Sequence, residues 1–137
     1  RSRGLGDVYK RQIQQTEAEL SHVSDLMAAV VQYAKTRPVF DGYKVAKYSR
    51  KYLAEHEAEL ADYRAAKATM AELLGGEKLP KMDVLKEKRR QLAARKKALY
   101  LEYRKAQQDM RELVAVKGSV DHLRGLTDNQ RNKEQAR

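Results

Sequence analysis

Apolar residues recur at helical spacing along most of the chain. In residues 13–36 the repeat is seven positions long and begins at Ile13, Leu20 and Met27. An apolar residue at every seventh position draws one seam along a helix, and such seams pair side by side. In residues 49–74 the apolar residues recur at alternating spacings of three and four, which also describe one helical face. The pattern predicts two long amphipathic helices.

A third stretch, residues 82–117, contains neither glycine nor proline and is the longest of the three. Gly118 is predicted to end it. Residues 39–48 are expected to form a short helical connector, and residues 119–126 a short terminal helix. The seam of the third stretch consists of apolar residues one heptad apart, namely Leu85, Leu92, Leu99, Ala106 and Leu113.

The predicted helix ends depend on a few residues with strong local preferences. Pro38 disfavours helical backbone in the residue before it, so the first helix is expected to end near Thr36. Ser49 is a suitable N-cap for the second helix, because its hydroxyl can accept from a free backbone N–H. Gly75 is a suitable C-cap, and the turn from Gly75 to Pro80 folds the second and third helices into a hairpin.

These elements predict an all-α fold, an elongated antiparallel helical bundle or coiled-coil hairpin that covers residues 13–126. Three long helices form it, with short connecting and terminal helices. Residues 127–137 have one apolar residue, Ala136, and are expected to form a disordered polar tail. Thin apolar stripes bury little surface relative to the entropy lost on ordering, so moderate stability is expected.

The first twelve residues, RSRGLGDVYKRQ, form a segment of a different kind. Residues 7–12 resemble the translation of a transposase mosaic-end adapter, as left in sequencing libraries. We therefore expect residues 1–12 to be adapter-derived or disordered and to lie outside the fold. An ordinary basic N-terminal arm is the alternative. The adapter interpretation further implies that the natural chain begins upstream.

Composition narrows the classes of function. The 137 residues include 29 Lys and Arg, 19 Asp and Glu, and no cysteine, which gives a formal net charge of +10. Without cysteine the chain has no disulfide, thiolate zinc site or thiol nucleophile. No apolar run approaches the ~20 residues that a membrane span requires, so no membrane insertion is expected. The composition is that of a soluble, basic, helical protein.

No pattern of catalytic or metal-binding residues is present in the sequence. The three histidines, His22, His56 and His122, are too far apart for a two-histidine metal motif. His56 is expected at the edge of the core, and the other two at the surface. The sequence contains neither the phosphate-binding pattern GxxxxGK[ST] nor the dinucleotide-binding pattern GxGxxG. We therefore expect no enzyme activity in this chain by itself, no cofactor and no small-molecule substrate.

One segment has a higher proportion of basic residues than the rest of the chain. Residues 86–97 contain seven basic side chains and one acidic one. A basic helix can neutralise phosphates and release counterions without reading bases, so DNA is a possible partner through its backbone. A solvated helix face that keeps a bundle soluble is an equally weighted alternative. The candidate nucleic-acid-binding residues are Lys86, Lys88, Arg89, Arg90, Arg95, Lys96 and Lys97.

Aromatic residues offer a second, weaker indication of nucleic-acid binding. Exposed tyrosines can stack on the bases of a single strand. At helical spacing, however, tyrosines more often belong to the core or its edge, and that interpretation is favoured here. The tyrosines concerned are Tyr33, Tyr43, Tyr48, Tyr52 and Tyr63.

Several segments, in order, resemble one family. Residues 33–43 (YAKTRPVFDGY) and 47–59 (KYSRKYLAEHEAE) are similar to two stretches of the bacterial mobilisation relaxases of conjugative and mobilisable elements. Residues 78–80, 99–104 and 120–123 resemble three later landmarks of the same proteins. The resemblance covers about residues 13–126 and falls on the C-terminal helical region of that family.

The resemblance implies a non-catalytic accessory region in the bacterial cytoplasm. The family's nicking chemistry uses a tyrosine nucleophile and a histidine-bound metal in an N-terminal nuclease domain, and neither motif is present here. The accessory region would assist DNA transfer by binding the DNA backbone or by docking to partners. The alternative is a structural coiled-coil module that binds itself or the transfer machinery without contacting DNA. Its candidate seams are Ile13, Leu20, Met27 and Val30, and Leu92, Leu99, Met110 and Leu113.

Overall fold

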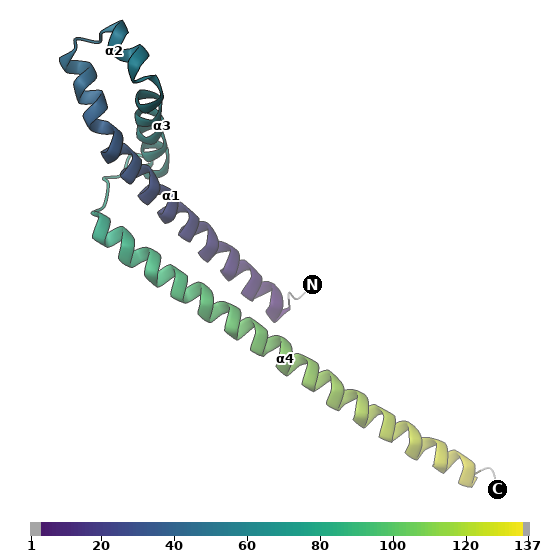
Figure 1. The fold of residues 1–137 in the computed structure, drawn as a ribbon. Coiled ribbons are helices and arrows are strands. Elements are labelled where there is room, and N and C mark those ends of the chain that lie inside the picture. The colour runs from purple at the N-terminus through teal and green to yellow at the C-terminus, as the bar shows by residue number, and fades with distance from the viewer. Residues whose placement is uncertain (1–3, 136–137) are drawn as a thin grey trace. The chain divides into compact units, whose positions relative to one another are not determined.

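The computed structural model describes residues 4–135, and in that range it contains four helices and no strand. In chain order they are α1 (Leu5–Val45), α2 (Arg50–Glu55), α3 (Glu57–Leu74) and α4 (Met82–Gln135), as Figure 1 shows. The predicted all-α fold is confirmed. Residue contacts divide the chain into two compact units, Gln14–Lys96 and a second one made of Arg1–Ile13 with Lys97–Arg137.

The core of the unit Gln14–Lys96 lies where α1, α3 and α4 meet. Its buried residues are Val23, Leu26 and Met27 of α1 together with Leu85 and Leu92 of α4. Three of the predicted heptad positions, Met27, Leu85 and Leu92, therefore belong to one core. Partly buried residues from the α3 end and the following turn complete it, among them Met70, Leu73, Leu74, Leu79 and Met82.

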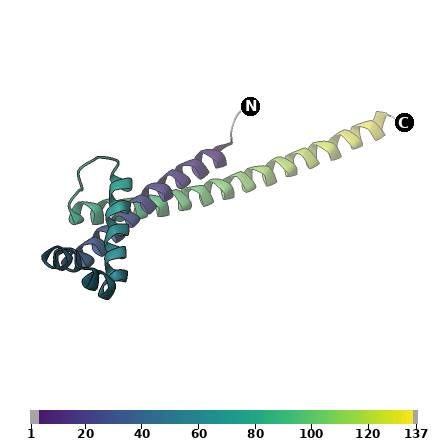
Figure 2. The same cartoon turned by 90° about the horizontal axis from the view of Figure 1, so that it is seen from above.

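Helices α2 and α3 return beside the second half of α1, as Figures 1 and 2 show from two directions. The Tyr33 ring of α1 stacks on Tyr63 of α3 at 5.1 Å between ring centroids. Further along, His22 Nε2 of α1 lies 2.8 Å from the Leu73 carbonyl oxygen of α3, to which it donates. Because residue numbers rise along one helix as they fall along the other, α1 and α3 are antiparallel.

Helix α1 continues through Pro38 to Val45, so the predicted end at Thr36 is wrong. A proline inside a helix removes one backbone hydrogen bond and costs about 3 kcal/mol. Aromatic contacts on both sides of Pro38 offset that cost, because Tyr33 and Phe40 both stack on Tyr63. The predicted connector, residues 39–48, is mostly the last two turns of α1 and not a separate helix.

The caps of the second predicted helix are confirmed, but the helix itself is interrupted. Ser49 caps α2, since its hydroxyl oxygen accepts from the Tyr52 N–H at 3.4 Å. Gly75 ends α3 in the left-handed conformation, with φ of 55°. Between the two helices, His56 leaves helical geometry, so residues 49–74 form α2 and α3.

The second unit contains the first turns of α1 and most of α4. Ile13 and Leu99 are buried in it, at 5% and 8% exposure. The Tyr9 and Tyr103 rings approach to 6.1 Å between centroids. Residues 5–12 are therefore helical and not disordered, while residues 1–3 lie outside the described part of the chain. The adapter origin of this segment stays a prediction.

Helix α4 does not end at Gly118 but continues through Gly125 to Gln135. The predicted terminal helix, residues 119–126, and the predicted disordered tail are both part of it as far as residue 135. Residues 136–137 lie outside the described range. Glycine inside a helix costs only about 1 kcal/mol relative to alanine, so it weakens a helix without necessarily ending it.

Candidate nucleic-acid interface

The seven candidate DNA-binding residues lie on consecutive turns of α4. Six of them are exposed to solvent, and Lys96 is half-buried. Long basic side chains on a regular helix are held at fixed intervals along its axis, about 1.5 Å per residue. The helix therefore presents a row of cations whose spacing is set by the backbone.

The buried seam of α4 sorts these cations into three rows. Arg89 and Lys96 follow the buried Leu85 and Leu92 by four positions each, so both lie beside the seam. Lys88 and Arg95 follow the same leucines by three positions and flank the other edge. The third row, on the side of the helix away from the seam, consists of Lys86, Arg90 and Lys97.

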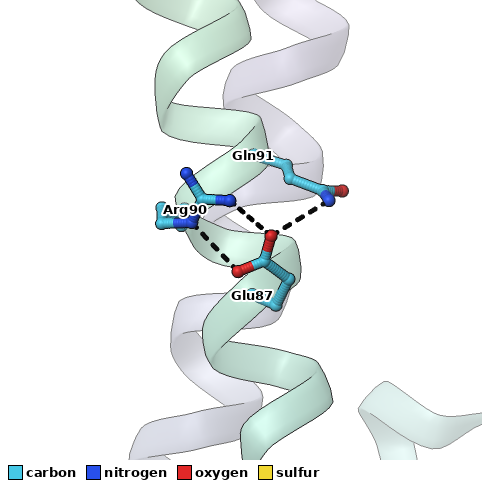
Figure 3. A network of polar contacts seen from close by, with 3 residues as sticks. All are labelled: Glu87, Arg90 and Gln91. Carbon is cyan, nitrogen blue, oxygen red and sulfur yellow. Dashed lines mark hydrogen bonds and ion pairs between the residues drawn. The ribbon is translucent and has the colours of Figure 1, made fainter.

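Arg90 is held by a carboxylate on its own helix, as Figure 3 shows. Its Nε donates to Glu87 Oε2 at 2.9 Å, and its Nη2 donates to Glu87 Oε1. Gln91 Nε2 donates to the same Oε1 at 3.2 Å. The hydrogen bond from Arg90 lowers the pKa of the Glu87 carboxyl below its usual value, so the pair stays charged at neutral pH.

Charge is unevenly distributed within the unit Gln14–Lys96. Helix α3 carries four exposed acidic residues, Glu57, Glu59, Asp62 and Glu72, against Arg64 and Lys67. Within residues 86–96 of α4, by contrast, Glu87 is the one acid among six bases. A polyanion would therefore meet attraction along this part of α4 and mixed charge along α3.

A second basic group lies at the α1–α2 turn and was not singled out from the sequence. Lys44, Lys47, Arg50 and Lys51 are all exposed there. The signal was available, since these four bases fall within eight consecutive residues. Lys44 Nζ lies 3.6 Å from Asp41 Oδ1, so part of this charge is locally compensated. Glu87 compensates Arg90 on α4 in the same way.

The tyrosines mostly belong to the core, as favoured from the sequence. Tyr43 and Tyr63 are buried, Tyr33 and Tyr52 are half-buried, and Tyr48 alone of the five is well exposed, at 58%. Four of the five therefore offer no free face of the kind that stacks on bases. The candidate interface consists of charged groups and not of stacking platforms.

Among the side chains that the structure describes, no group of three metal-ligating residues comes together. His56 lies at the junction of α2 and α3, half-buried as predicted, with its Nδ1 3.9 Å from Glu59 Oε1. His22 and His122 are exposed, also as predicted. None of the described helices is long and apolar enough to span a bilayer.

Comparison of the chain with protein-family models, with curated proteins and with solved structures found no match.

Proposed function

We propose that this chain is a helical accessory region of a mobilisation relaxase that binds the DNA backbone through the basic rows of α4. The DNA-binding part is supported by the seven cations from Lys86 to Lys97. Six of them are exposed, and Glu87 is the one acid among them. The link to relaxases has the sequence resemblance as its support. Contacts of this kind hold a protein on DNA without selecting a sequence.

Two features of the geometry support phosphate binding over a merely solvated face. Lys86 and Arg90 project from the side of α4 away from its buried leucines, where a bulky duplex has access. Lys88 and Arg95 extend the positive surface around one edge. An approaching phosphate backbone would then meet several cations at once and release a counterion for each.

Binding of the full chain to random-sequence duplex and single-stranded DNA, measured across a range of salt concentrations, tests the proposal. We expect log K to fall linearly with log salt. The double variant K86Q/K88Q, at two exposed lysines, should reduce the salt slope by about two. R64Q/K67Q on α3 is the matched control, because it removes the same charge from exposed positions elsewhere. No binding at low salt, or equal losses in both variants, would refute a specific role for α4.

The relaxase assignment has a separate test, the coding sequence upstream of Ile13. An in-frame nuclease domain with a tyrosine nucleophile and a histidine cluster would support the assignment. A start codon immediately upstream, or a domain of an unrelated class, would contradict it. Neither outcome changes the result expected from the DNA-binding measurements.

The alternative function is a coiled-coil interaction module, and the exposure of its candidate seam residues indicates which of them are free to pair. Of its candidate seam residues, Ile13, Met27, Leu92 and Leu99 are buried within the chain and so are not free to pair with a partner. Two others, Met110 and Leu113, are more than half exposed. The part of this α4 seam that is free to pair therefore lies beyond Ala106.

A further inference from the structure

The part of α4 that follows Leu113 is a helix without tertiary cover, whereas Met110 and Leu113 line a shallow groove together with Leu5 and Tyr9 of α1. Every described side chain from Gln107 onward is exposed. Isolated helices are marginal in water, and helices in proteins gain most of their stability by burying an apolar face. Two glycines, Gly118 and Gly125, weaken this segment further. The segment therefore lacks the packing that normally keeps a helix folded.

An apolar seam begins at Leu113 and runs along this uncovered segment. Its members follow one another at spacings of three, four and three, which are the a and d positions of two heptads. Their exposures range from 41% to 64%, which is high for aliphatic side chains. We call these residues the distal seam: Leu113, Val116, Val120 and Leu123.

The residues around the distal seam fit a second helix of the same kind. Gly118 and Gly125 both fall at position f, the point farthest from the seam, where the absence of a side chain costs no contact. At both sites a built Cβ meets nothing within 4 Å. The second heptad has Val120 at a and Leu123 at d, the combination that favours two parallel strands, and the first heptad has the reverse order, Leu113 at a and Val116 at d.

Charges beside the distal seam determine the orientation. Glu112 lies at position g, and Lys117 and Arg124 lie at successive e positions. In a parallel dimer g faces the e position five residues later in the other helix, which brings Glu112 of each copy to Lys117 of its partner. In an antiparallel dimer the e positions face one another, which would bring these cations together.

We propose that the distal seam is the interface of a parallel, in-register coiled-coil dimer between two copies of this chain. The proposal narrows the interaction-module alternative to a single partner. It does not depend on DNA binding, because the distal seam shares no residue with the basic rows, and failure of one experiment leaves the other intact.

Sedimentation equilibrium of the full chain across a concentration series tests the interface. We expect a concentration-dependent species of twice the 15.8 kDa chain mass. L123E should weaken dimerisation at least about tenfold, because it places a carboxylate in each half of an apolar seam. L101E is the matched control, since Leu101 is an exposed α4 leucine outside the distal seam. A monomer at all concentrations, or equal effects of both variants, would overturn the proposal.

A charge swap tests the pairing of Glu112 with Lys117. E112K alone and K117E alone should each weaken the dimer, because each juxtaposes like charges across the interface. The double variant E112K/K117E should recover affinity close to that of the unmodified chain. Recovery is specific to the parallel g–e arrangement. A double variant whose loss of dimer affinity equals the sum of the two single losses would contradict that orientation.

Single cysteines give an independent measure of register, because the chain has none of its own. In a parallel, in-register dimer each seam position meets its own copy, so L113C and L123C should both form interchain disulfides on oxidation. G118C, at position f, is the control and should remain reduced. Cross-linking at one of the two seam positions but not the other would indicate an antiparallel pair and refute the proposal.

Discussion

Arg90 and Glu87 form a two-point ion pair on the exposed side of α4, with Arg90 Nε 2.9 Å from Glu87 Oε2. The pKa of Glu87 is lowered, first by its hydrogen bond from Arg90. A carboxyl whose folded pKa is lowered adds stability above its unfolded pKa, and that stability is lost as pH falls through the folded pKa. At neutral pH the pair is therefore formed, and a phosphate has to compete with Glu87 for Arg90.

The variant E87Q should bind DNA more tightly than the unmodified chain at low salt. It frees Arg90 and removes the carboxylate closest to the proposed phosphate path, so a gain of about two- to fivefold is expected. Affinity measured by fluorescence anisotropy checks this. E72Q, which removes one exposed acid from α3, is the control, and an equal gain in both would show that net charge alone matters.

Replacement of Gly42 by alanine should destabilise the fold, although alanine is the better helix former by about 1 kcal/mol. A Cβ built at Gly42 overlaps the Tyr52 hydroxyl and lies 3.1 Å from the ring Cζ. That hydroxyl donates to the Val39 carbonyl oxygen at 2.7 Å, so moving it breaks a hydrogen bond. We expect a loss of about 1–3 kcal/mol in the free energy of unfolding, measured by urea denaturation.

Two further variants isolate the cause of the Gly42 effect. In a Y52F background the overlapping hydroxyl is absent, so the G42A substitution should cost less than it does in the unmodified chain. G118A, at a glycine with open space around it, should leave stability unchanged or raise it. A stabilising G42A would contradict the close approach of Tyr52 to α1.

Replacement of Pro38 by alanine should stabilise the protein. Pro38 is exposed inside α1 and lacks the N–H that would bond to the Ala34 carbonyl. Alanine restores that bond, while the greater freedom of the unfolded chain offsets about 0.4–1 kcal/mol of the gain. We expect a net increase of about 2 kcal/mol in the free energy of unfolding. A decrease would indicate that the proline geometry is needed to position Phe40 and Tyr33.

Stability should fall in alkaline solution because of Tyr63. Its pKa is raised, first by the hydrogen bond with Tyr33 and then by burial. A tyrosine with a raised folded pKa adds stability that is complete below the unfolded value of about 10 and is lost as pH rises through the folded pKa. Thermal melts followed by circular dichroism should therefore show a decline above pH about 10. Y63F should flatten that decline, and an unchanged pH profile in Y63F would assign it to other groups.

The candidate interface could be predicted only in part. The run from Lys86 to Lys97 is visible in the sequence, because consecutive basic residues on a helix require no knowledge of the fold. Its division into rows depends on which side of α4 is buried. The predicted seam, with Leu85 and Leu92, had already indicated that side. The ion pair between Glu87 and Arg90 could be recognised only from side-chain geometry. Their spacing of three positions on a helix was nevertheless compatible with such a pair.

Local chemistry was enough to predict the helical class, the heptad positions of α4 and the caps at Ser49 and Gly75. Each of these depends on backbone preferences or on periodicity within a few turns. The contacts that offset the cost of Pro38 inside α1 come from Tyr63, a residue far away in sequence whose ring stacks on Tyr33 before the proline and on Phe40 after it. The tertiary structure also decided that the seam with Leu85 and Leu92 is buried within the chain, whereas the distal seam stays exposed. Periodicity shows that a helix has an apolar face, but only the packing of distant segments determines what covers that face.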